Sequence, residues 1–248
     1  MFGFGSKLPV TEDERDWVDE GFARLSTMLG RRRMLDCAVV LPTDEFFPDA
    51  YDGTESGLDK MFRQVCRYMG VDGGTLELSL IPDGSEIADL LPEYSHASRD
   101  PAGLHFGRTA DEPTLIGLKA CLLKDPLGAV ATLAHELGHV VLLDGGHMSR
   151  DLEDMEPMTD LATVFLGLGV FTANASRRFK QFQEDRRQGW STKHQGYLPE
   201  VVFGYALARF AKERGEAKPA WTQYLSTNLK TWFRQSATWL ERESQTRG

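Results

Sequence analysis

Residues 134–139 read Ala134-His135-Glu136-Leu137-Gly138-His139, and the interpretation of the whole chain starts from this stretch. It lies within a strongly apolar run, residues 128–143, whose length and composition predict a buried helix. The two histidines are four residues apart, so a helix places both imidazoles on one face, one turn above the other. Two neutral imidazoles in this arrangement can share one tetrahedral metal ion.

Glu136 follows the first histidine and lies about 100° around the predicted helix from it. From there its carboxylate can reach a water molecule at the metal without being a ligand itself. Zinc lowers the pKa of such a water toward about 7, and Glu136 can take its proton and pass it to a leaving amine. A glycine at position 138 destabilises a helix by about 1 kcal/mol. We interpret its presence as a sign that the space between the histidines is left open so that another group can approach closely. The alternative is a pair of structural core histidines with a surface glutamate.

A metal held by two histidines needs a third protein ligand, and the acidic segment after the helix supplies candidates. The side chains considered are Asp144, His147, Asp151, Glu153, Asp154, Glu156 and Asp160. Glu156 and Asp160 are four apart at the start of the next predicted helix, so one can bind the metal while the other accepts from a ligand histidine. Which of the two is the ligand stays open, and both could be ordinary acids at a helix N-terminus.

The pattern H-E-L-G-H followed by E-x-x-x-D resembles the zincin metallopeptidases, specifically their gluzincin branch, over about residues 114–170. The resemblance implies Zn2+ as cofactor. It implies His135, His139 and Glu156 as metal ligands and Glu136 as general base. It also implies that Asp160 accepts a hydrogen bond from a ligand histidine. It also implies an active-site helix packed under a small sheet, whose edge strand holds a peptide or protein substrate in extended form. The 16 residues between His139 and Glu156 are fewer than in the best-known members.

Zincins also use a tyrosine or histidine to stabilise the oxyanion that forms when water attacks the carbonyl. His194 and Tyr197, in a predicted loop between helices, are the candidates for this catalytic role, and Tyr205 is a third. Cys121, just before the motif helix, is an alternative thiolate ligand of the kind found in deformylase-like sites.

The pattern of the whole chain predicts an α+β fold, with a small mixed sheet and flanking helices followed by a mainly helical C-terminal part. The elements expected before residue 125 are helices at 11–29 and 54–69 and strands at 37–41, 75–81, 104–106 and 114–123. Those expected after it are helices at 128–143, 157–174, 174–188, 199–214 and 219–243. We interpret residues 1–248 as a single zincin-like domain with two lobes, an α/β lobe at 1–124 and a helical lobe at 125–248 that carries the metal site.

Composition argues against several classes of partner. The chain has 248 residues and a formal net charge of -9, whereas nucleic-acid binding needs a basic surface. The cysteines, Cys37, Cys66 and Cys121, are odd in number and widely spaced, which argues against a disulfide framework. We find neither a signal peptide nor an apolar stretch of membrane-spanning length. We therefore expect a cytoplasmic protein with no nucleic-acid or membrane partner, and its oligomeric state stays open.

Together these residues predict a zinc-dependent metallopeptidase that hydrolyses a peptide bond through a metal-activated water, with Glu136 as general base. Two alternatives stay open. One is a zinc amidohydrolase or deacylase acting on a small substrate. The other is a non-catalytic zincin-like binding or regulatory module whose zinc is structural and offers no open coordination position.

Overall fold

The computed structural model describes residues 7–83, 103–106, 113–144, 146–149, 152–184 and 198–247. The helices in these residues are α1 (Glu12–Leu25), α2 (Arg31–Asp36), α3 (Glu55–Met69), α5 (Pro126–His139), α6 (Met155–Phe165), α7 (Gly169–Glu184), α8 (Glu200–Glu213) and α9 (Thr227–Arg247). The strands are β1 (Leu76–Ile81), β2 (Gly103–Phe106) and β3 (Thr114–Lys119). Short 3-10 turns lie at Gly73–Thr75, Ala120–Lys124 and Ala220–Tyr224, and π-helical turns lie at Ser26–Gly30 and Val140–Asp144.

Several helix ends follow directly from local capping residues. The Thr11 hydroxyl accepts from the Glu14 backbone N–H at 3.2 Å, while the Glu14 carboxylate accepts from the Thr11 N–H at 2.8 Å, and this capping box begins α1. The Thr54 hydroxyl accepts from the Gly57 backbone N–H and caps α3, and Gly70 ends that helix with a left-handed φ of 64°. Asp125 caps α5, the helix that carries the motif.

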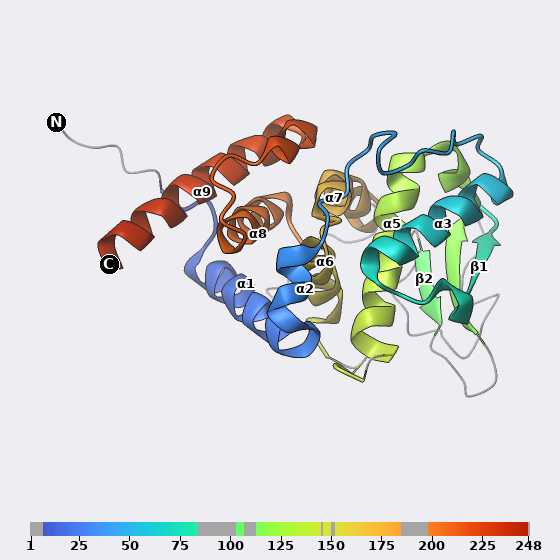
Figure 1. Cartoon of the computed structure of the whole chain (residues 1–248), viewed down its shortest axis with the longest axis horizontal. Helices are drawn as coiled ribbons and strands as arrows, with labels where there is room; N and C mark the ends of the chain where they lie inside the picture. Colours follow the sequence, from blue (N-terminus) through green and yellow to red (C-terminus); the bar gives the residue numbers. More distant parts are fainter. Residues whose placement is uncertain are drawn as a thin grey trace.

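The strands form one mixed sheet in the order β1-β3-β2, in which β1 runs parallel to β3 and β2 antiparallel to it. Helix α5 packs against β2 and β3, and α3 packs on α5, so the sheet and these two helices form one end of the molecule (Figure 1). The C-terminal part is mostly helical. At this level the mixture of helices and a small sheet agrees with the predicted α+β class.

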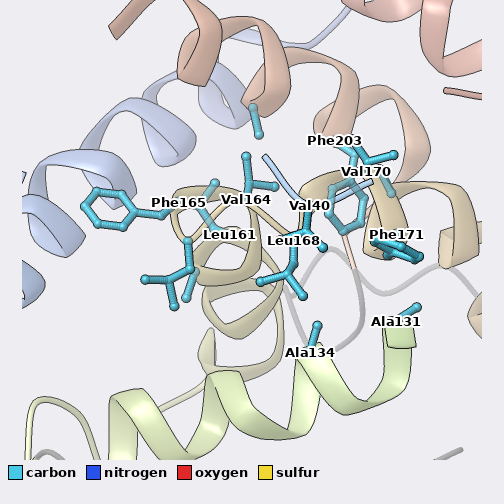
Figure 2. Packing of buried hydrophobic residues seen from close by; sticks show 14 of the residues in the cluster. Val40, Ala131, Ala134, Leu161, Val164, Phe165, Leu168, Val170, Phe171 and Phe203 are labelled. Atoms are coloured by element: carbon cyan, nitrogen blue, oxygen red, sulfur yellow. The ribbon is translucent and has the colours of Figure 1, made fainter. Parts of the chain in front are cut away.

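Helix α5 lies at the centre of the packing. Its residues from Gly128 to His139 are all buried, as the apolar run predicted. Opposite the sheet it packs on α6 and α7, and Figure 2 shows Ala131 and Ala134 pointing toward side chains of that layer, among them Phe171. The window Pro126–Leu143 is long and apolar enough to cross a membrane, which corrects the expectation that no stretch is; 83% of it is buried inside the protein.

Helix α1 joins the N-terminal part of the chain to the C-terminal helices, because it packs on α6 and α8 (Figure 1). Helix α8 packs in turn on α9. Side chains from both sides of residue 125 belong to one continuous hydrophobic core. The division into two lobes stays a prediction.

The strand expected at 114–123 ends at Lys119, and the helix expected at 219–243 begins at Thr227. Two further errors in the predicted elements involve Gly167. The segment 37–41 is not a strand; it runs past Gly167, whose carbonyl accepts from the Val40 N–H at 2.9 Å. The break between the two helices after the motif falls at Gly167, with φ of 87°, and α7 continues through Asn174. A Cβ on Gly167 would lie 2.1 Å from the Ala38 carbonyl oxygen, so a contact distant in sequence requires glycine here.

Candidate metal centre

Helices α5 and α6 approach each other closely at Gly138. A Cβ there would lie 2.8 Å from Thr159 Cγ2 and 3.3 Å from the Thr159 carbonyl oxygen. The close approach that we expected at Gly138 is therefore made by α6, whose Thr159 fills the space that we expected to be open. On the other side of α6, a Cβ on Gly21 of α1 would lie 2.4 Å from Leu161 Cδ2. Two glycines thus let α6 pack tightly between α5 and α1.

This close packing brings His135 and His139 of α5 together with Glu156 of α6. One ligand atom from each lies within 4.8 Å of the others. Glu156 Oε2 is 3.0 Å from His135 Nε2 and 3.5 Å from His139 Nε2. The side chains of His135 and His139 are 3% and 11% exposed, whereas the Glu156 side chain is 38% exposed, so the cluster reaches the surface at the carboxylate.

The Nδ1 atom of each imidazole, the ring nitrogen that does not face Glu156, is hydrogen-bonded to a side chain of α6. His135 Nδ1 lies 2.8 Å from Asp160 Oδ1, and Asp160 Oδ2 accepts from the Leu198 backbone N–H at 2.8 Å. His139 Nδ1 lies 3.2 Å from the Thr159 hydroxyl. Each Nε2 therefore faces Glu156. Metal-ligating histidines characteristically have the second ring nitrogen held in this way.

The charges in the cluster favour a cation. Burial by itself lowers the pKa of His135, but the carboxylates of Asp160 and Glu156 outweigh burial and hold that pKa well above its ordinary value. Burial raises the pKa of Glu156, but the neighbouring imidazoles of His135 and His139 hold it below its ordinary value. Two imidazole nitrogens and one carboxylate oxygen are also a donor set that catalytic zinc uses. The residues present therefore fit the metal that the sequence pattern implies.

Only some of the proposed catalytic residues lie in the part of the chain that the structure describes. Glu136 is on α5, directly after His135, and is 3% exposed. His194 and Tyr197 lie outside the described residues. The Tyr205 hydroxyl donates to Asp19 Oδ1 on α1 at 3.0 Å, and burial together with Asp19 raises the pKa of Tyr205 above its ordinary value. Tyr205 therefore joins α8 to α1, which leaves it unsuited to stabilise an oxyanion at the cluster.

The remaining ligand candidates do not join the cluster in the part of the chain that the structure describes. His147 and Glu153 are exposed, and Asp154 forms an ion pair with Arg24 at 3.2 Å. Cys121 is exposed, which leaves no support for a thiolate ligand there. Asp151 lies outside the described residues, as does the side chain of Asp144.

Sequence reasoning missed Thr159. A signal was present, because residues 156, 159 and 160 are spaced i, i+3 and i+4 and must share one face of a helix. Since that face also supplies Glu156 and Asp160, a hydroxyl beside them could have been assigned to the same site.

Gly138→Ala should weaken both the fold and metal binding. Its Cβ would push α6 away from α5 at Thr159, so we expect a loss of about 1–3 kcal/mol in the free energy of unfolding. Displacement of Glu156 should lower zinc affinity about tenfold. The measurements are urea denaturation of the metal-free protein and zinc competition with a chromophoric chelator.

Gly204→Ala is the matched control, because a Cβ there would lie 2.4 Å from Trp232 Cβ, where α8 meets α9. It should lose stability and keep its zinc affinity. Equal zinc affinity in the two variants would refute the link between Gly138 and the cluster.

Comparisons with protein families, with curated proteins and with solved structures found no match for this chain. The resemblance to zincins therefore rests on the motif residues. The function has to be argued from the chemistry of the cluster itself.

Proposed function

We propose that this protein is a zinc-dependent metallopeptidase with a gluzincin-like active-site helix, in which His135, His139 and Glu156 hold the metal. The observation that carries the proposal is that three ligand atoms lie within 4.8 Å of one another, while Nδ1 of both imidazoles is hydrogen-bonded to side chains of α6. Buried imidazoles facing a carboxylate need a cation or protons between them. The two histidines and the glutamate supply the ligand number and types of a catalytic zinc site.

Zinc bound at this position would act as a Lewis acid, which would polarise a carbonyl and lower the pKa of a water molecule toward about 7. Glu136 acts as general base by taking a proton from the attacking water, and then as general acid by passing it to the leaving amine. Asp160 accepts from His135 Nδ1 and so holds that ring with Nε2 toward Glu156. The cluster is exposed at Glu156, where a substrate can approach.

The expected substrate is a peptide or protein in the cytoplasm. In the proposed arrangement an extended peptide pairs with an edge strand of the sheet above the active-site helix. Strand β2 is an edge strand of the described sheet and packs on α5. A small acylated amide needs no such strand, so cleavage of a peptide library against hydrolysis of small amides distinguishes the two kinds of substrate.

Zinc content tests the proposal directly. The protein is purified without added zinc and without a metal-binding tag, and metal is measured by elemental analysis. We expect about one zinc per chain in the wild type and a sharp loss in Glu156→Ala, because removing one of three ligands leaves too few to hold the ion. Glu153→Ala, an exposed acid of the same segment, is the control and should keep its zinc.

A wild-type protein that contains no metal and takes none up on addition of zinc would refute the metal site. Zinc retained in Glu156→Ala would refute Glu156 as a ligand. Hydroxamate inhibitors add a check on catalysis, because they need an open coordination position and would fail against a purely structural zinc.

A further inference from the structure

The Thr159 hydroxyl lies between two partners on different helices. It is 2.8 Å from the carbonyl oxygen of Met155, one turn earlier on α6, and 3.2 Å from His139 Nδ1 on α5. Thr159 is fully buried. Bulk water therefore cannot replace either partner. The direction of the single hydroxyl proton decides whether Thr159 donates a hydrogen bond to His139 or accepts one from it.

The Met155 carbonyl decides that direction. A carbonyl oxygen only accepts, so the shorter contact uses the one proton of the hydroxyl. Toward His139 the hydroxyl then presents a lone pair, and Nδ1 must carry the proton to complete the bond. A neutral imidazole protonated at Nδ1 has its lone pair at Nε2, the atom that lies 3.5 Å from Glu156 Oε2.

We propose that Thr159 is a positioning residue that holds His139 in the Nδ1-protonated tautomer, with Nε2 ready to bind the metal. The inference rests on the proposed zinc site and adds a residue to it. The two ligand histidines thereby have unlike partners, a carboxylate for His135 and a neutral hydroxyl for His139. A second carboxylate at the Thr159 position would add another buried negative charge beside Glu156 and Asp160, which the hydroxyl avoids.

The packing around Thr159 shows which substitution isolates the hydroxyl. Its methyl group fills the space at Gly138, where a Cβ would lie 2.8 Å from Thr159 Cγ2. Valine keeps a branched side chain of similar shape and removes only the hydrogen-bonding group. Serine keeps the hydroxyl and removes the methyl group.

The test compares the wild type with Thr159→Val, Thr159→Ser and Thr163→Val. Thr163 is the matched control because it is also fully buried on α6, and its hydroxyl bonds to Thr172 and to the Asp160 carbonyl. Nitrogen NMR of 15N-histidine-labelled, metal-free protein, recorded at a pH where the His139 imidazole carries a single proton, reports which ring nitrogen holds that proton. Competition with a chromophoric chelator reports zinc affinity.

We expect His139 protonated at Nδ1 in the wild type and in Thr159→Ser, and a mixture of tautomers in Thr159→Val. Zinc affinity should fall about tenfold in Thr159→Val, recover in Thr159→Ser and stay at the wild-type value in Thr163→Val.

The role of Thr159 is overturned if wild-type His139 carries its proton at Nε2, or if both valine variants bind zinc equally well. A wild type that takes up no zinc refutes the proposed function instead. In that case the NMR measurement on the metal-free protein still decides whether Thr159 holds the His139 tautomer.

Discussion

Glu136→Gln will bind zinc as the wild-type protein does and will hydrolyse peptides about 10²–10⁴-fold more slowly, the contribution that general acid–base catalysis typically makes. The substitution exchanges one oxygen for an amide group and leaves size and helix propensity nearly unchanged. The amide cannot take a proton from water, so the chemical step is slowed. Zinc content and initial rates on a cleaved peptide from the library are the two measurements.

The position of Glu136 makes this result specific. The residue is 3% exposed and follows the ligand His135 on α5, but it is not one of the three clustered ligand residues. Glu153→Gln introduces the same chemical change at an exposed position and should keep full activity. A Glu136→Gln protein that holds zinc and cleaves at the wild-type rate would eliminate the proposed mechanism while leaving the metal site intact.

Asp160→Ala should be among the most destabilising single changes in this protein. Asp160 is 2% exposed, and its oxygens accept from His135 Nδ1 and from the Leu198 N–H. Alanine leaves both donors buried without an acceptor, and breaking a buried charged pair in this way costs about 3–5 kcal/mol. This is a large part of the total stability of a domain, which is about 5–15 kcal/mol, so the thermal unfolding temperature of the metal-free protein should fall by roughly 10 °C.

The same substitution should weaken zinc binding about 10–100-fold, because His135 loses the partner that orients it. Asp160→Asn separates the two effects. Its single side-chain oxygen can serve one donor while the NH₂ group meets the other, so we expect losses between those of the wild type and of Asp160→Ala. Asp154→Ala, which removes a surface ion pair with Arg24, should change stability by less than about 1 kcal/mol. Equal unfolding temperatures for Asp160→Ala and Asp154→Ala would contradict the proposed role.

Local signals in the sequence predicted much of the framework. The capping residues Thr11 and Thr54 begin α1 and α3 where expected, and Gly70 ends α3. The apolar run before His139 is a fully buried helix. These features were accessible because capping and periodic burial depend on residues within a few positions of one another.

Long-range packing decided the features that were predicted wrongly. The apolar segment 37–41 has the composition of a strand, but the Val40 N–H bonds to the Gly167 carbonyl, and within the segment Val40 is buried while Ala38 is exposed. Asn174 has the propensity to end a helix, yet its side chain bonds to the Tyr224 carbonyl and the Ser226 N–H while α7 continues through it. In both cases tertiary contacts outweighed local preference.

The sequence by itself determined that His135 and His139 share one face of a buried helix, because a spacing of four residues has that consequence in any α-helix. It also limited the further partners to a few acidic residues downstream. Only the tertiary structure decided that Glu156 faces both Nε2 atoms and that Asp160 and Thr159 are hydrogen-bonded to the Nδ1 atoms. It also decided that α6 packs closely against α5 at Gly138. The physical reason is that these contacts depend on where two helices cross, and helical periodicity within either one carries no information about that crossing.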